Sequence, residues 1–228
     1  MRCSVCGGTS FSHSQVLWDG LVAEWEINDV ERKYIDRQQG SRCNACGTNF
    51  RSIALAGSIM EHWSFRGTFR DFVREFPHLK ALEINEASDL TRPLSDLSDR
   101  ILAEYPAVDM HEMPYADQKF DLVVHSDTLE HVKNPVAALK ECRRVLRPGG
   151  LLAFTVPVIV DRMSRTREGL AKSYHGFPTT GTDDYLVYTE YGSDMWRQVI
   201  EAGFDSVKIN TFDFPAGIAI SACIHNAG

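Results

Sequence analysis

Residues 119–157 read KFDLVVHSDTLEHVKNPVAALKECRRVLRPGGLLAFTVP, and this stretch decides the fold. Two apolar runs of strand length, Leu122–Val124 and Leu151–Val156, flank a helical pattern. Asn134 is a good helix N-cap, and Pro135 stands at the first helical position, where a missing N–H is tolerated. The order strand, helix, strand predicts a βαβ unit with parallel pairing and a right-handed crossover. Neither run alternates apolar with polar residues, so both sheet faces are expected to be covered.

Length and composition set the outer limits of the fold. The chain has 228 residues, of which 43% are hydrophobic, enough for one α/β domain and a small module. Its net charge of −7 argues against a large non-specific nucleic-acid surface or a basic membrane patch. No apolar run approaches the roughly 18 residues of a spanning helix, and the sequence opens without a secretory signal. We therefore expect a cytoplasmic protein with no membrane segment and no nucleic-acid partner.

Four cysteines form two matched C-x-x-C-G units near the N-terminus: Cys3, Cys6, Cys43 and Cys46. Without an export signal, metal binding explains them better than disulfides. The spacing lets two thiolates approach one ion, and the following glycine permits the left-handed turn that points N–H groups at sulfur. Four thiolates make a closed tetrahedral zinc site of structural type. Free thiols, a redox pair and an iron–sulfur cluster are the alternatives.

The chain divides into three parts by pattern. Residues 1–50 are interpreted as the zinc-binding module, in which Asn28 and Glu31 have capping-box spacing and Gly40 stops a helix. Residues 51–78 are interpreted as linking helices, and residues 51–76 read as helix, because an apolar stripe continues through them. Residues 79–228 then form the main domain.

The main domain reads as strands and helices around one long loop. Strands are predicted at 79–84 and 101–105, with a helix over 90–98. Residues 158–190 read as an irregular loop, a length that is usually functional or mobile. Ser193 is expected to cap a helix that Gly203 ends, and 207–212 and 217–224 are predicted as two closing strands.

With these elements in place, residues 79–224 resemble the class I S-adenosylmethionine-dependent methyltransferases, in particular the small-molecule branch called type 11. The matching segments are Leu82-Glu83-Ile84, Met113-Pro114-Tyr115, Phe120-Asp121-Leu122-Val123, Leu129-Glu130-His131-Val132, Arg144-Val145-Leu146-Arg147-Pro148-Gly149-Gly150 and Glu201-Ala202-Gly203-Phe204. The resemblance implies an α/β fold with a doubly wound, mostly parallel sheet and one antiparallel edge strand.

The resemblance also implies a cofactor site outside the carboxyl ends of the parallel strands. A carboxylate after the second strand can accept two hydrogen bonds from the ribose hydroxyls, and a polar residue with a soft apolar neighbour suits the adenine. The residues carried over are Glu83, Asn85 and Ala87 at the methionine end, Glu104 at the ribose, Asp109 and Met110 at the adenine, and His125 and Ser126 beneath the sulfonium.

Two departures from the family pattern lie at this site. The family's first loop is glycine-rich, because glycine lets the backbone approach the cofactor. Here residues 85–89 read Asn-Glu-Ala-Ser-Asp, which tolerates part of the left-handed turn but adds the negative charges of Glu86 and Asp89. Only three residues separate Tyr105 from Asp109, where the family places a helix and part of a strand. That edge of the sheet is therefore expected to be shortened.

Candidate catalytic residues follow the fourth and fifth strands. His131 is a candidate general base for an oxygen or nitrogen nucleophile, since imidazole titrates near neutral pH; packing or capping is the alternative. His175 lies in the long loop among aromatics, where it orients substrate or remains a surface residue. Asp127 caps a turn or takes part in catalysis. Four cations of the same loop either grip an anionic substrate or form a solvated run: Arg162, Arg165, Arg167 and Lys172.

The leading hypothesis is a methyltransferase that acts on a small molecule or biosynthetic intermediate and uses S-adenosylmethionine, with structural zinc in the module. Methyl transfer needs mainly positioning of nucleophile and sulfonium, so the lack of an obvious nucleophile is no objection. The alternative is a methyltransferase-like binding or scaffolding protein that has lost cofactor binding through its glycine-less loop. Nucleic-acid modification, with the module as reader, is disfavoured by the acidic balance. The sequence specifies neither the substrate nor the oligomeric state.

Overall fold

A six-stranded sheet forms the centre of the protein in a computed structural model that describes residues 1–174 and 183–225. The strand order is β10-β11-β6-β5-β3-β4. From one edge to the other, the strands are β4 (Arg100–Ala103), β3 (Ala81–Ile84), β5 (Phe120–Ser126), β6 (Leu146–Thr155), β11 (Gly217–Cys223) and β10 (Ser206–Phe212). The first four are parallel, and β11 is antiparallel to both of its neighbours, β6 and β10. The antiparallel strand therefore lies one position inside the edge and not at the edge itself, where the resemblance implied it. The mostly parallel α/β fold is confirmed. The expected shortening of the edge after Tyr105 is also confirmed, because β4 is the edge strand and no described strand lies beyond it.

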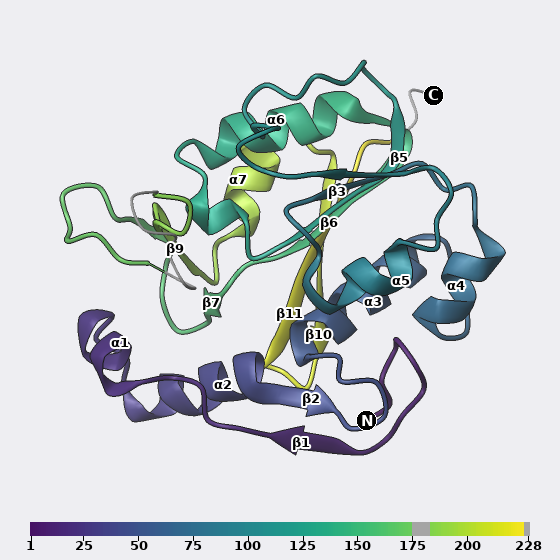
Figure 1. The fold of residues 1–228 in the computed structure, drawn as a ribbon. Coiled ribbons are helices and arrows are strands. Elements are labelled where there is room, and N and C mark those ends of the chain that lie inside the picture. The colour runs from purple at the N-terminus through teal and green to yellow at the C-terminus, as the bar shows by residue number, and fades with distance from the viewer. Residues whose placement is uncertain (175–182, 226–228) are drawn as a thin grey trace.

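Helices cover both faces of this sheet (Figure 1). On one side lie α6 (Pro135–Val145) and α7 (Trp196–Glu201); on the other lie α3 (Phe50–His62), α4 (Phe69–Glu75) and α5 (Thr91–Leu94). Within the described residues, none of the helices combines the length and apolarity that crossing a membrane requires.

The central βαβ unit forms as its sequence predicts. The Asn134 side chain accepts a hydrogen bond from the Ala137 N–H, with Pro135 at the first helical position. The helix ends at Val145 and the next strand begins at once at Leu146, so the arginine–proline–glycine run already belongs to β6. Successive side chains of β5 enter opposite cores, which is why both of its faces are apolar.

The N-terminal module lies along one side of the sheet domain. It contains β1 (Phe11–His13) paired antiparallel with β2 (Ser41–Cys43), and the helices α1 (Asp19–Glu24) and α2 (Asp29–Gly40). The predicted capping box of Asn28 and Glu31 is confirmed. Position 40 also requires glycine for a steric reason, because a Cβ there would lie 1.8 Å from the Ser14 carbonyl oxygen.

Three predicted elements differ in their limits. The expected continuous helix over 51–76 is broken, because the chain reverses with Ser64 at φ 52° and restarts at a Thr68–Asp71 capping box. The helix expected over 90–98 is a single short turn after a 3₁₀ segment, Ser88–Leu90. The last helix begins at Trp196 rather than at a Ser193 cap.

The predicted loop 158–190 contains part of a small sheet. Its strands are β7 (Val158–Ile159), β8 (Arg165–Thr166) and β9 (Thr189–Gly192). The cations of this segment are engaged by carboxylates of the same chain: Arg165 and Arg167 bind Glu190, and Lys172 binds Asp183. They therefore hold the segment together instead of forming a solvated charge run.

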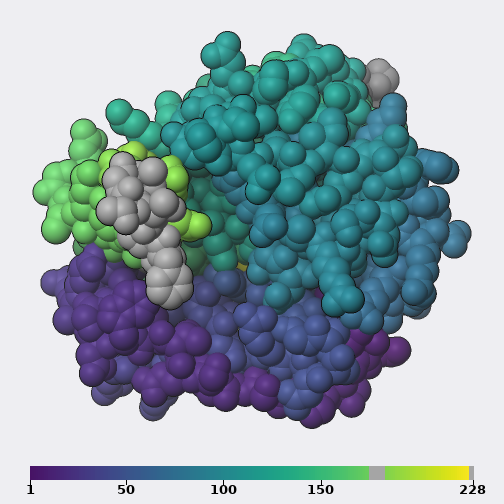
Figure 2. Space-filling view, viewed as in Figure 1, coloured from purple at the N-terminus to yellow at the C-terminus, as the bar shows by residue number. Residues whose placement is uncertain are grey.

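Arg162 ties this segment to the N-terminal module. Its guanidinium donates to the Glu31 carboxylate at 2.7 and 2.6 Å and to the carbonyl oxygens of Trp25 and Glu26 at 2.8 and 2.7 Å. Besides the cores on the two faces of the sheet, a smaller apolar cluster joins the module to the segment after β6. Its members are Leu17, Leu21, Trp25, Ile27, Tyr34, Ile35, Ile159 and Val187. Figure 2 shows the module (purple) packed directly against the green segment that follows β6.

We predict that Glu31→Gln lowers the free energy of unfolding by about 2 kcal/mol at pH 7, because it leaves Arg162 without its buried carboxylate. The hydrogen bond from Arg162 lowers the pKa of Glu31, so the stabilisation is present above the unfolded-state pKa and is lost as pH falls through the lowered folded-state value. Urea unfolding of both proteins from pH 7 to pH 3 should show the difference shrinking. Asp19→Asn, which breaks the exposed Arg32–Asp19 pair, is the control and should cost under about 1 kcal/mol. Equal losses in the two variants would contradict the prediction.

His125 of β5 is buried in the core, where its ring stacks on Phe154 with centroids 4.8 Å apart. Neither ring nitrogen has a hydrogen-bond partner among the described residues. Burial lowers the pKa of His125 to about 3, so the imidazole is neutral at physiological pH.

This depressed pKa predicts acid sensitivity. Between about pH 6.5 and pH 3 the unfolded chain protonates His125 and the folded chain does not, so stability falls as pH falls. His125→Phe should remove this term. We expect the free energy of unfolding of the variant to rise by about 2 kcal/mol relative to that of the wild type as pH drops from 6.5 to 5, because each pH unit contributes up to about 1.36 kcal/mol. Urea unfolding at pH 7.5, 6.5 and 5 measures the change; a constant difference would refute it.

Candidate functional site

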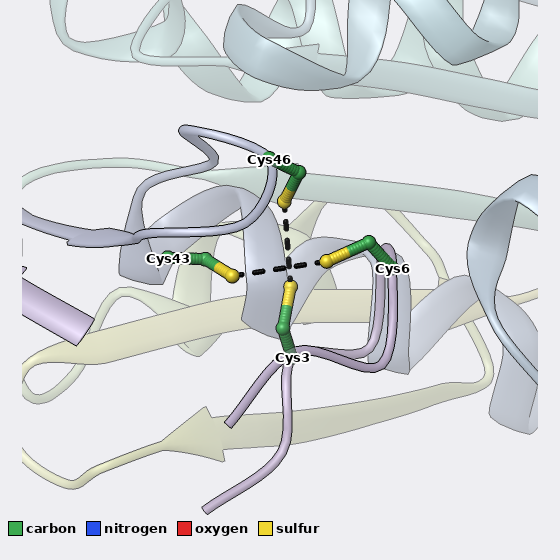
Figure 3. Close-up of side chains that lie close together, drawn as sticks. All are labelled: Cys3, Cys6, Cys43 and Cys46. Carbon is green, nitrogen blue, oxygen red and sulfur yellow. Dashed lines mark hydrogen bonds between the residues drawn. The ribbon is translucent and has the colours of Figure 1, made fainter. Parts of the chain in front are cut away.

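The four N-terminal cysteines converge from two loops onto one point (Figure 3). Their sulfur atoms all lie within 4.8 Å of one another. The Sγ atoms of Cys3 and Cys46 are 3.8 Å apart, and those of Cys6 and Cys43 are 3.7 Å apart. A tetrahedral ion with Zn–S bonds of about 2.3 Å needs sulfur–sulfur separations of about 3.8 Å. The donor set therefore fits zinc in both chemistry and size.

The turns behind these sulfurs have the expected backbone. Gly7 and Gly47, which follow the two C-x-x-C pairs, adopt φ values of 81° and 77°. The next N–H, of Gly8, donates to the Cys6 sulfur at 3.4 Å. Four sulfur donors leave no open coordination position for a substrate, which suits a structural ion.

The loop after β3 adopts the left-handed turns that glycine would permit, although it contains none. Asn85, Glu86 and Ser88 have φ values of 51°, 55° and 54°. Beneath the loop, the Glu83 carboxylate is fully buried and accepts hydrogen bonds from the Ala87 N–H at 2.7 Å and the Thr91 hydroxyl at 2.5 Å. Its second oxygen pairs with Arg100 at 2.5 Å. Glu83 thus shapes the loop from below, and Ala87 is buried within it.

The N-terminal module holds the far end of the same loop. The Asp89 carboxylate accepts a hydrogen bond from the Asn49 N–H at 2.8 Å and pairs with Arg42 at 3.1 Å. The Asn49 side chain also donates to the Ser88 hydroxyl at 3.1 Å. We call these contacts of Arg42 and Asn49 with Ser88 and Asp89 the module clasp. It joins the residues on either side of the second cysteine pair, Cys43 and Cys46, to the loop at the carboxyl end of β3.

The next strand ends lie beside this loop. The Asn85 side-chain oxygen accepts from the Tyr105 N–H at 2.8 Å, which joins the loops after β3 and β4, and Glu104 between them is exposed. Asp109 accepts from the N–H and ring of His111, and the backbone hydrogen bond lowers the pKa of Asp109. Met110 is buried in the core.

On β5, Ser126 bonds the Thr155 hydroxyl at 2.8 Å, whereas the His125 ring points into the core. The structure therefore brings the main chain of the predicted cofactor positions to one edge of the sheet. It does not present the His125 imidazole there.

A polar cluster follows β5. Arg51, from the first turn of α3, pairs with the Asp127 carboxylate at 2.5 Å, and Asp127 itself has φ 49°. Burial raises the pKa of Asp127, while the Arg51 charge opposes that shift. Burial and then the neighbouring Asp127 charge raise the pKa of Glu130 well above its usual value. Both effects favour the protonated, uncharged form of Glu130.

His131 completes this cluster. Its Nδ1 lies 3.0 Å from the Leu186 carbonyl oxygen, which can only accept, so Nδ1 carries the proton in the neutral ring and Nε2 carries the lone pair. Burial lowers the pKa of His131, which keeps the imidazole neutral at pH 7. That is the protonation state a general base requires. His175, the other predicted catalytic residue, lies outside the described residues.

A cavity of ≈ 360 Å³ opens over this cluster. Its polar floor contains Arg51, Asp127, Glu130 and His131, and its apolar wall comes largely from the N-terminal module. Sequence reasoning missed Arg51, Glu130 and the wall residues Trp25 and Gln38. Arg51 lies in the first turn of its helix, before the apolar residues that begin at Ile53, so all four residues needed the tertiary structure.

Comparisons with known proteins agree on one family. A family model described as a methyltransferase domain matches residues 70–154. The ubiquinone/menaquinone biosynthesis C-methyltransferase of Proteus mirabilis is 32% identical over 200 residues, which cover 80% of this chain and 75% of that protein.

Other relatives match over shorter parts of their length. Ubiquinone biosynthesis O-methyltransferases of Parvibaculum lavamentivorans and Hahella chejuensis are 28% and 25% identical; the matches cover 42% and 77% of this chain but 34% and 65% of those proteins. Among solved structures, the 1,6-didemethyltoxoflavin-N1-methyltransferase of Burkholderia thailandensis is 11% identical, covers 94% of each chain and has a TM-score of 0.46. On its match to the Proteus mirabilis protein, this chain belongs to the class I S-adenosylmethionine-dependent methyltransferase family.

Proposed function

We propose that the protein transfers a methyl group from S-adenosylmethionine to a small-molecule acceptor. One observation supports this best: the carboxyl ends of β3, β4 and β5 share an edge, and a ligand-sized cavity with a polar floor opens beside it. Family membership supplies the chemistry, and the names of relatives that act in ubiquinone biosynthesis are consistent with a small acceptor.

The loop backbone at Asn85–Ala87, the exposed Glu104 carboxylate and the turn at Asp109–Met110 are the groups we assign to cofactor binding. The cofactor supplies an electrophilic methyl group when bound. The chain positions the acceptor on the polar floor, where the neutral His131 ring takes the proton of a hydroxyl or amine at Nε2 as the new bond to carbon forms. Glu130, whose protonated form burial favours, is placed on the same floor to donate a hydrogen bond to the acceptor.

Zinc in the four-cysteine site has a structural role in this proposal. The ion would hold the two cysteine loops together. The hydrogen bonds of the module clasp would then fix the positions of residues 88–89. The metal lies apart from the reaction but supports the shape of the cofactor loop.

Calorimetric titration of S-adenosylmethionine and S-adenosylhomocysteine into zinc-loaded protein tests the cofactor assignment. We expect binding in the wild type and about tenfold weaker binding in Glu104→Ala, because the carboxylate can bond both ribose hydroxyls. Glu112→Ala, an exposed neighbouring acid, is the matched control and should bind as the wild type does. Absence of heat at near-millimolar ligand would reject the enzyme and favour the scaffolding alternative.

Metal analysis tests the module. We expect about one zinc ion per chain, lost in Cys46→Ser and retained in Cys142→Ser, whose thiol is buried far along the chain. Chelation should lower Tm by roughly 10 °C or more, since structural zinc contributes folding energy directly. It should also weaken S-adenosylhomocysteine binding through the clasp. Full stability and full metal content in Cys46→Ser would overturn the zinc site.

A further inference from the structure

Most of the apolar wall of the cavity belongs to the N-terminal module, and the sheet domain adds Pro157, Val158, Ile159 and Tyr185. Helix α1 and its flanks contribute Trp18, Leu21, Trp25 and Ile27, and α2 adds Ile35. Opposite them stands the polar floor at the end of β5. The cavity therefore has one mainly apolar side, supplied largely by the module, and one polar side, supplied by α3 and the segment after β5.

The wall is held in place before any ligand binds. The Trp25 indole N–H donates to the Ser173 hydroxyl at 2.9 Å, and the Arg167 guanidinium lies over the indole ring at 5.5 Å. The Asp36 carboxylate accepts hydrogen bonds at 2.8 Å from the backbone N–H groups of both Val16 and Leu17, which fixes the chain entering α1. Such preorganisation is typical of small-molecule sites.

Gln38 places an unsatisfied polar group in the same wall. Its side chain is fully buried and lines the cavity, yet neither its amide oxygen nor its amide nitrogen has a partner within the described part of the chain. Buried polar groups in native proteins are nearly always hydrogen-bonded. An amide with a free donor and a free acceptor therefore points to a polar group on the molecule that fills the cavity.

The charges of the floor disfavour an anionic ligand. Arg51 pairs with the Asp127 carboxylate at 2.5 Å, although its Nε has no partner among the described residues. An anionic acceptor would have to compete with Asp127 for this cation, and it would lose its water in a cavity with apolar walls.

We infer that α1 and Gln38 form the specificity wall of the acceptor site, and that this wall selects an uncharged, ring-shaped acceptor whose hydroxyl faces the Asp127–His131 floor. The rings of Trp18, Trp25 and Tyr185 provide flat apolar surfaces for stacking. The identification of the bound molecule as an acceptor rests on the proposed function; the binding preference does not.

The test uses 2-naphthol, an uncharged aromatic alcohol, and 2-naphthoate, its anionic counterpart, titrated calorimetrically into zinc-loaded full-length protein. We expect 2-naphthol to bind and 2-naphthoate to bind at least about tenfold more weakly. Leu21→Trp, which fills the cavity, should weaken 2-naphthol binding by about tenfold or more. Val30→Trp, an exposed position on α2, is the control and should leave binding unchanged.

Two further variants keep the test decisive. Trp18→Ala alters a side chain that is 57% exposed, so folding is retained, and it should weaken 2-naphthol binding several-fold. Gln38→Leu should raise Tm, because it removes an unsatisfied buried amide, and should weaken binding of 2,6-dihydroxynaphthalene about fivefold. Gln15→Leu, at an exposed glutamine outside the cavity, should change neither.

Equal binding of the two naphthalenes, no binding of 2-naphthol, or unchanged binding in both Leu21→Trp and Trp18→Ala would overturn the inference. Unchanged dihydroxynaphthalene binding in Gln38→Leu would remove Gln38 from the wall. A parallel titration with S-adenosylhomocysteine separates the two claims. Cofactor binding without 2-naphthol binding refutes the specificity wall alone, and 2-naphthol binding without cofactor binding refutes the proposed function alone.

Discussion

The hydrogen bonds that hold the loop after β3 are the constraint on which the proposed site depends. Three residues other than glycine, Asn85, Glu86 and Ser88, adopt left-handed backbone conformations there. Each such residue costs about 1 kcal/mol or more, so the loop keeps its shape only where its surroundings compensate. Glu83 compensates from below and the module clasp from the side. A glycine-rich loop would adopt this path with less support from its neighbours.

This requirement gives the N-terminal module two connected roles. Its four-cysteine end carries the clasp through Arg42 and Asn49, which flank the second cysteine pair. Its helical end carries α1, which Arg162 fastens to the segment after β6. The module thus touches the loop after β3 at one end and the cavity at the other. A change at the four-cysteine cluster is expected to reach both ends through the backbone that joins them.

Local rules predicted the parts of the fold that depend on neighbouring residues. The caps at Asn28 and Asn134, the strands of the sheet and the glycine turns behind the cysteines are all set by a few adjacent positions. The break after His62 escaped prediction because apolar spacing continues through it while the chain reverses. The cavity escaped prediction for a different reason: Trp25 and Asp127 lie about a hundred residues apart in sequence, and no local pattern indicates that α1 and the segment after β5 line the same cavity.

The charge of the altered loop is the strongest sequence argument for lost cofactor binding, and the structure weakens it. Glu86 and Asp89 place two carboxylates where the methionine end of the cofactor is expected. Asp89, however, pairs with Arg42 and accepts the Asn49 N–H, so its charge is largely compensated inside the chain. Glu86 is exposed, and water screens its charge. The balance of charge at the loop is therefore closer to that of a neutral glycine loop than its sequence indicates, and this favours retained cofactor binding.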